Sequence, residues 1–335
     1  MTDLAAPGAD MVAQDYWQHV EADDLAGAAR LAEELASDGW SVTDIVEQLI
    51  TPTQHHVGTL WARDRWSVSR EHAATALNEA VVRRIGSIRR ISQASASEPE
   101  VLVVCAESEW HALPALCVTA LLNDSEIPAV FLGADVHVPT VHSEAVRLNT
   151  RAVLISASLA SSLPYVHRLV GVVRAARVPV VVGGSAFDGD GLRAAALGAT
   201  ASAVTGSQLP DLIRALPAGV TPLAERRHEA ASESEHLTAR RREVAASILA
   251  EVSQAHTGQW RDFVGEQLPH LLGALEAALL VNDPGLVSQA WEWFDDVLEH
   301  RGGAGAAAEV RAAVTRSVRE FPLADRMMSD TAPAS

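Results

Sequence analysis

The chain has 335 residues, 48% of them hydrophobic, which is enough for two or three compact domains with real cores. Its formal net charge of -17 would repel a phosphate backbone, and it holds no helix-turn-helix or zinc-finger pattern, so direct nucleic-acid binding is not expected. Cys105 and Cys117 suggest neither a disulfide framework nor a zinc site and are expected to be core thiols. Without a signal-peptide pattern or a run of about 18 apolar residues, the protein is expected to be cytoplasmic.

Apolar side chains recur at helical spacing throughout residues 10–92. Gly39 closes the first stretch, and the hydroxyl of Ser41 can cap the next one, which Pro52 ends. Because short connections join the stretches, an antiparallel four-helix bundle is predicted. Its helices are expected over residues 15–39, 41–52, 57–61 and 67–85.

Within this segment, Trp61 is followed after nine residues by the pair Glu71-His72. A tryptophan near a helix end is ordinarily part of a core, and a Glu-His pair at a helix start ordinarily reflects the helix dipole and solvation. The residues alone therefore leave a structural role and a ligand-binding role open.

In residues 99–217, strand-like runs alternate with helical patterns, which predicts a doubly wound, five-stranded parallel sheet. The strands are expected over residues 101–106, 129–132, 152–156, 178–182 and 201–204, with helices over 113–122, 141–148, 165–175 and 192–197. No Gly-x-Gly-x-x-Gly turn follows the first strand, so a dinucleotide site is not expected.

The loop Glu107-Ser108-Glu109-Trp110-His111 follows the first predicted strand. Ligands of open α/β sheets bind at the carboxyl ends of the strands. A carboxylate two residues before a histidine suits a metal ligand with its orienting partner, because Glu109 can hold one ring nitrogen of His111 while the other faces a metal. Such a triplet also occurs by chance in many proteins.

Residues 225–328 read as a third, helical domain. A charged stretch over residues 224–235 is expected to be a linker, and helices are expected over 237–255, 260–281, 284–300 and 306–318, the second broken or kinked by Pro269. The aromatic residues of this segment are typical of a bundle core or a dimer interface. They are Trp260, Phe263, Trp291, Trp293 and Phe294.

The Trp61, nine-residue, Glu71-His72 pattern resembles the helical bundle of adenosylcobalamin-dependent photoreceptors of the transcriptional-repressor type. The resemblance implies that Trp61 covers the upper face of the corrin and that Glu71 and His72 contact the adenosyl group. Some members have a cobalt-ligating histidine directly after the tryptophan, where this chain has Ala62. A bis-histidine light product from that position is therefore excluded, and His55 and His56 are the remaining candidates nearby.

Glu109-Trp110-His111 is similar to the acidic-x-His-x-x-Gly motif of cobalamin domains that bind the cofactor base-off, His-on. The resemblance implies that His111 is the lower cobalt ligand and that Glu109 orients it. It also implies that the displaced nucleotide tail threads past small residues, for which Ser156, Ser158, Leu159, Gly183 and Gly184 stand at the expected strand ends. Pro114 departs from the family's glycine, and its ring could crowd the tail.

The order of the three segments resembles the photocobilins, photoreceptors that bind both adenosylcobalamin and biliverdin. This likeness spans nearly the whole chain, with its motifs confined to residues 61–184. It implies that the C-terminal helices cradle biliverdin, noncovalently because residues 225–328 contain no cysteine. Aromatic walls and partners for two propionates are expected from Trp260, His270 and Trp291, together with Trp293, His256 and Arg261.

The resemblance thus implies a light sensor, not an enzyme, in which light-driven Co–C cleavage changes conformation and oligomeric state, with the signal passing to a partner protein or read out as self-association. One alternative is a corrinoid methyl-carrier protein or a mutase subunit, which would share the His111-type ligand and a helical cap. A cobalamin-storage or interaction protein is a further alternative. The Trp61 to His72 pattern and the C-terminal domain favour the sensor.

Overall fold

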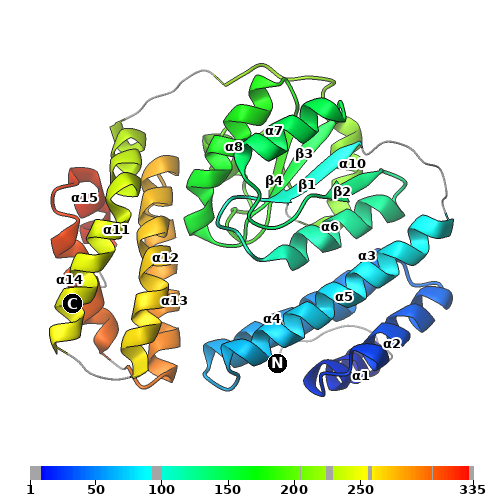
Figure 1. Cartoon of the computed structure of the whole chain (residues 1–335), viewed down its shortest axis with the longest axis horizontal. Helices are drawn as coiled ribbons and strands as arrows, with labels where there is room; N and C mark the ends of the chain where they lie inside the picture. Colours follow the sequence, from blue (N-terminus) through cyan, green and yellow to red (C-terminus); the bar gives the residue numbers. More distant parts are fainter. Residues whose placement is uncertain are drawn as a thin grey trace.

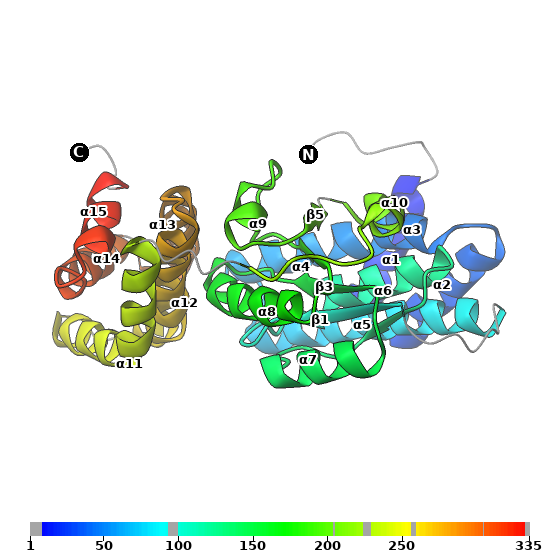
Figure 2. The same ribbon diagram turned by 90° about the horizontal axis from the view of Figure 1, so that it is seen from above.

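The computed structural model describes residues 9–92, 100–203, 205–223, 229–255, 259–303 and 305–331. Three parts follow one another along the chain: an N-terminal helical bundle, a parallel-sheet domain above it, and C-terminal helices beside both (Figure 1). Figure 2 shows the C-terminal helices standing at one end of the molecule. The predicted fold class is confirmed.

The N-terminal bundle differs from the prediction in where its helices break. The helix predicted over residues 15–39 is two helices, because Asp23 takes a left-handed conformation (φ 56) and the Asp24 carboxylate caps the second helix through the Gly27 amide at 2.9 Å. The elements are α1 (Ala9–Glu21), α2 (Leu25–Ser37), α3 (Val42–Ile45), a π turn (Val46–Ile50), α4 (Thr51–Ala62) and α5 (Val68–Ser92).

The helices predicted over residues 41–52 and 57–61 form one continuous run, so Pro52 does not end a helix. The π turn immediately before it is wider than an α-helical turn, which relieves the clash between the proline ring and the preceding carbonyls. The predicted cap at Ser41 is confirmed: its hydroxyl accepts from the Asp44 amide at 3.1 Å, and the Asp44 carboxylate accepts from the Ser41 amide at 2.9 Å.

The sheet is parallel throughout and has the order β2-β1-β3-β4-β5. The order reverses between β1 and β3, so the loops that follow these two strands meet at the switch point where open α/β sheets bind ligands. The elements are β1 (Val101–Cys105), α6 (Ala112–Asp124), β2 (Ala129–Phe131), α7 (Val138–Arg147), β3 (Ala152–Ser156), the short turn η2 (Ala160–Ser162), α8 (Leu163–Ala175), β4 (Val180–Gly183), α9 (Leu192–Ala196), β5 (Ala201–Ala203), the short turn η3 (Gly206–Gln208) and α10 (Leu209–Ala215).

Helix α6 is apolar on two sides because it lies between the sheet and the bundle. Ala115 and Leu122 join the core on the sheet, whereas Leu116 and Cys117 join the core of the bundle. Cys105 and Cys117 are buried free thiols, as predicted, and burial raises the pKa of each to about 12. The bundle is therefore fixed to the sheet through α6.

The C-terminal helices share an apolar core with the other face of the sheet domain. Helix α12 contacts η2, α8 and α9. The elements are α11 (Glu229–Ala255), α12 (Gln259–Val281), α13 (Gly285–His300), α14 (Ala306–Ser317) and α15 (Pro322–Asp330). Residues 229–235, predicted as linker, are already helical, α12 continues through Pro269, and α10 and α15 were not predicted. Among the described helices, none has the length and apolar character needed to cross a membrane.

Candidate functional site

The loop after β1 is braced by the loop after β2, which holds it in an unusual conformation. Ser108 has a positive φ of 65, and its amide donates to the Asp135 carboxylate at 2.8 Å. In return, the Asp135 amide donates to the Glu109 carbonyl at 3.0 Å. This turn directs the Glu109 side chain inward and leaves His111 as the residue that immediately precedes α6.

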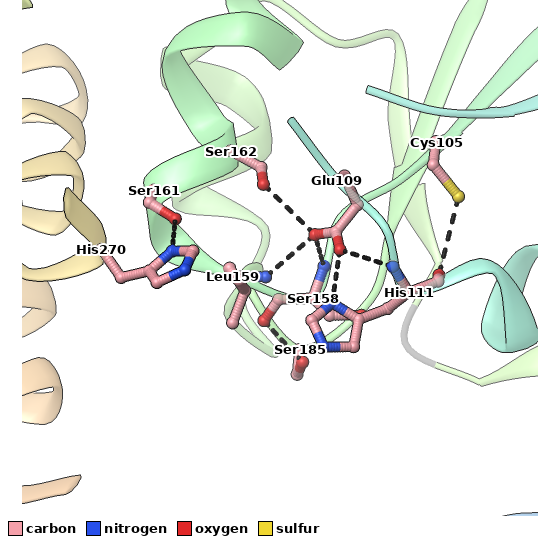
Figure 3. A network of polar contacts seen from close by, with 9 residues as sticks. All are labelled: Cys105, Glu109, His111, Ser158, Leu159, Ser161, Ser162, Ser185 and His270. Carbon is pink, nitrogen blue, oxygen red and sulfur yellow. Dashed lines mark hydrogen bonds and ion pairs between the residues drawn. The ribbon is translucent and has the colours of Figure 1, made fainter. Parts of the chain in front are cut away.

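Glu109 is a completely buried carboxylate whose two oxygens serve different parts of the site (Figure 3). Oε1 accepts from His111 twice, from Nδ1 at 2.5 Å and from the amide at 3.0 Å. Oε2 accepts from the amides of Ser158 and Leu159, at 2.7 and 3.1 Å, and from the Ser162 hydroxyl at 3.2 Å. A buried charge needs such partners, and here five donors compensate its loss of water.

The hydrogen bond between Glu109 and His111 favours the charged form of Glu109 and fixes the tautomer of His111. Burial alone would raise the pKa of Glu109, but the hydrogen bonds and charge of His111 and the Ser158 amide outweigh it and lower that pKa. The hydrogen bond to Glu109 raises the pKa of His111. Because Nδ1 is engaged with the carboxylate, Nε2 is the ring nitrogen left for a ligand, and the His111 side chain is 54% exposed.

A cavity of about 90 Å³, which neither Glu109 nor His111 lines, lies between α6 and the ends of β3 to β5. Gly184 has a φ of 110, and a Cβ there would lie 2.3 Å from the Ala157 carbonyl oxygen, so only glycine fits. Ser156, Gly183 and Gly184, which were predicted to line the tail path, line this cavity, and Pro114 forms part of its wall. Ligand pockets usually measure about 300–1,000 Å³, so a nucleotide tail would require the surrounding loops to open.

Ser158 and Leu159, predicted to line the tail path, contribute backbone amides to Glu109. The Ser158 carbonyl also accepts from the Ser185 hydroxyl at 2.9 Å. Asp135, Ser162 and Ser185 were not predicted as site residues. No local pattern marks them, because each acts through a contact with a distant loop.

On the bundle, Glu71 and His72 stand at the start of α5. The Glu71 carboxylate accepts from the Thr75 hydroxyl at 2.8 Å, and its charge contributes to the raised pKa of His111. His72 is largely exposed, with its Nε2 3.4 Å from Glu71 Oε2.

Trp61 lies at the end of α4, where the bundle meets the C-terminal helices. Its ring stacks on that of Trp293, with centroids 6.1 Å apart and planes 20° apart, and lies 6.4 Å from the ring of Phe263. Arg301 donates to the Trp61 carbonyl at 2.9 Å and to the Asp64 carboxylate at 2.5 Å. We call Trp61, Trp293, Phe263 and Arg301 the aromatic clamp. It joins the predicted upper-face residue to the C-terminal domain.

The residues predicted for the bilin have different surroundings. Trp291 is buried in the core. Its ring is nearly perpendicular to that of Phe294, with centroids 5.7 Å apart, and the Arg311 Cζ lies 5.3 Å from the centroid of the Trp291 ring. His270 lies at the junction with the sheet domain, with its Nδ1 3.1 Å from the Ser161 hydroxyl. His256 and the side chains of Trp260 and Arg261 lie outside the described residues.

Two segments match known family models. Residues 99–209 match a model described as a B12 binding domain, and residues 12–85 match a second model with the same description. No curated protein matches the chain.

Among solved structures, the monomethylamine corrinoid protein of Methanosarcina barkeri is similar, with a TM-score of 0.52 and 16% identity, over 62% of this chain and 99% of that one. The methanol:cobalamin methyltransferase complex MtaBC of the same organism gives 0.35 and 17%, over 68% and 92%. A cobalamin-binding protein of Desulfitobacterium hafniense DCB-2 gives 0.34 and 13%, over 61% and 97%.

The residues at this site fit a corrinoid cofactor. Nε2 of His111 is available, Glu109 fixes the other ring nitrogen, and Gly184 allows the close backbone approach beside the cavity. One B12 model matches the parallel-sheet domain and the other matches the N-terminal bundle, and these two parts pack together through α6. The N-terminal bundle and the parallel-sheet domain of this chain are therefore a cobalamin-binding module.

Proposed function

We propose that the protein is a light sensor that binds adenosylcobalamin base-off, with His111 as the lower ligand. The observation that carries this proposal is the aromatic clamp. It connects Trp61, the residue expected above the corrin, to a helical domain that lies outside both B12 models. A carrier that only presents a corrinoid to other enzymes has no need of such a connection.

A bound adenosylcobalamin would supply a Co–C bond that visible light breaks. The residues of the chain have separate tasks around it. Glu109 holds His111 in one tautomer, and Gly184 keeps the tail path open beside the sheet. Glu71 and His72, at the start of α5, would contact the adenosyl group from the bundle.

Trp61 would lie beside a bound adenosyl group, so its position would depend on whether that group is present. Because the Trp61 carbonyl and Asp64 are both bound to Arg301, a shift at the end of α4 changes the contact between the bundle and α13. The ligand thereby biases an equilibrium between two domain arrangements. We propose that this equilibrium is read out as a change in self-association or by a partner protein, with no catalytic step in the chain.

We extend the proposal to a biliverdin bound noncovalently by the C-terminal helices. Trp291 is too enclosed to serve without repacking, so the aromatic clamp replaces it as the expected wall of the site. Arg301 supports this choice, because its buried Nε has no hydrogen-bond partner among the described residues and a propionate could accept from it.

A corrinoid methyl-carrier protein is the second candidate. It is favoured by the similarity of fold to the monomethylamine corrinoid protein, which this chain matches over 99% of that protein's length. A carrier would hold methylcobalamin and leave the C-terminal domain unaffected by light.

The deciding experiment loads the purified protein with adenosylcobalamin in the dark, illuminates it, and follows absorbance and elution volume. The sensor should lose the alkylcobalamin spectrum and change its elution volume, and a Trp61→Ala variant should lose the change in elution while still photolysing. Photolysis with no change in the elution or domain contacts of the wild type would contradict the sensor. If added biliverdin gives no red-shifted, protein-bound absorption band, the proposed biliverdin site is wrong.

A further inference from the structure

The C-terminal helix α12 touches the sheet domain at the short turn η2, which lies next to the buried carboxylate of the site. His270 Nδ1 is 3.1 Å from the Ser161 hydroxyl. One turn further along α12, Gly273 approaches the same serine so closely that a Cβ at this position would lie 2.5 Å from the Ser161 Cβ. His270 and Gly273 therefore both hold Ser161 in place, His270 through a hydrogen bond and Gly273 through close packing.

Ser161 belongs to the segment whose polar groups bind Glu109. All three donors to Glu109 Oε2 come from residues 158–162: two backbone amides and the hydroxyl of Ser162, the neighbour of Ser161. The other oxygen, Oε1, holds Nδ1 of His111. Figure 3 shows this series of contacts running from His270 to Ser161, across the turn to Glu109, and on to His111.

We propose that His270 is a positioning residue for the lower axial ligand, so that docking of α12 on η2 and coordination of cobalt by His111 stabilise each other. The inference rests on the proposed His-on binding and adds to it a route from the C-terminal domain to the metal. The fold assigns η2 to the sheet domain, yet its position is set in part by a helix outside the matched models.

The physical reason is the burial of Glu109. If α12 withdraws, residues 158–162 gain freedom, and the donors to Oε2 lose their fixed geometry. A fully buried carboxylate that loses donors must recover them elsewhere, which draws it away from the His111 ring. Coupling of this kind is reciprocal: whatever moves α12 weakens the axial bond, and whatever removes the axial bond loosens α12.

Electron paramagnetic resonance of the cobalt(II) form, in protein labelled with nitrogen-15 at histidine, tests this directly. An axial nitrogen-15 splits each cobalt line in two, whereas the benzimidazole nitrogen of the tail splits it in three. The wild type should show the twofold splitting. His270→Ala should weaken axial coordination about tenfold, the lower end of the effect of removing an outer-shell partner, so that threefold or unsplit lines appear. His270→Asn, which retains a polar group near the Nδ1 position, should restore the twofold pattern.

A glycine pair on α12 supplies a matched control. Gly273→Ala removes no polar group, but its Cβ forces α12 away from Ser161. It should therefore reproduce the loss of the twofold splitting expected in His270→Ala. Gly265→Ala, on the same helix, meets only the Leu249 Cδ2 atom at 3.6 Å and should match the wild type. His236→Ala, an exposed histidine of α11, should also match it.

Retention of the full twofold splitting in both His270→Ala and Gly273→Ala would overturn the proposal. Ser161→Ala removes the same hydrogen bond from the other side and decides the matter if either variant fails to fold. A wild type that lacks the twofold splitting would instead overturn His-on binding itself, so the two failures are distinguishable.

Discussion

The Glu109–His111 loop and the aromatic clamp are held together by different kinds of contact. The loop rests on a fully buried carboxylate with five donors, all from the sheet domain. The clamp joins two domains through the partly exposed rings of Trp61 and Trp293, the buried ring of Phe263 and one cation. Its ion pair with Asp64 is open to solvent on the Asp64 side. Donors fixed within one domain favour a rigid site, whereas stacked surfaces between domains can separate at lower cost. We therefore expect His111 to be held in place and Trp61 to move with the contact between the domains.

The largest effect is expected from Glu109→Ala. The variant leaves the amides of Ser158 and Leu159 without their acceptor and removes the partner of His111. We expect the free energy of unfolding to fall by about 3 kcal/mol, as when one partner of a buried pair is lost. Chemical denaturation at neutral pH measures it, with Glu107→Ala, a partly exposed neighbour paired to His137, expected to change it by less than about 1 kcal/mol. If both variants lost the same free energy of unfolding, the buried contacts of Glu109 would not be what makes the loop rigid.

A smaller effect is expected from Gly184→Ala. Its positive φ and the contact of its Cβ with the Ala157 carbonyl should together cost about 2 kcal/mol, and cobalamin affinity should fall because the tail path narrows. Gly189→Ala is the control, since a Cβ there meets nothing within 4 Å. Affinity is measured by titration followed in absorbance. Wild-type affinity in a folded Gly184→Ala protein would place the tail elsewhere.

Next comes the clamp. Arg301→Ala removes the contacts to Trp61 and Asp64 and the cation above the Trp61 and Phe263 rings, so a loss of about 1–2 kcal/mol is expected. Arg301→Lys should restore only part, because an ammonium lacks the planar fork of guanidinium. Thermal unfolding and tryptophan fluorescence report both changes, with the exposed Arg326→Ala as control. If Arg301→Ala were as costly as Glu109→Ala, the clamp would be as rigid as the loop.

The smallest effect is expected from Ser41→Ala, at a helix cap away from both regions. It should cost about 1 kcal/mol at neutral pH. Hydrogen bonds from the Ser41 hydroxyl and amide lower the pKa of Asp44, so its contribution is present above its unfolded pKa, about 4, and is lost as pH falls through the folded value. The gap between the variant and the wild type should therefore narrow in acid. A gap that widens there would contradict the capping box.

The sequence predicted what short-range patterns determine. Five strand-like runs that alternate with helical patterns located the strands, and the position of Glu109 and His111 after the first run located the switch point. The break at Asp23 was missed because the apolar spacing continues across it, and the stop expected at Pro52 was wrong because a π turn absorbs the proline. Partners that depend on the tertiary fold, such as Ser162, Asp135 and Arg301, carry no local signal.

We propose that His111 holds the cobalt from below while Glu109 fixes the tautomer of its ring. Titration of the wild type and of His111→Ala with adenosylcobalamin, followed by absorption spectra, tests this assignment. We expect the wild type to give a base-off spectrum with histidine bound and the variant to lose that spectrum. A His111→Ala protein with an unchanged cobalamin spectrum would contradict the assignment.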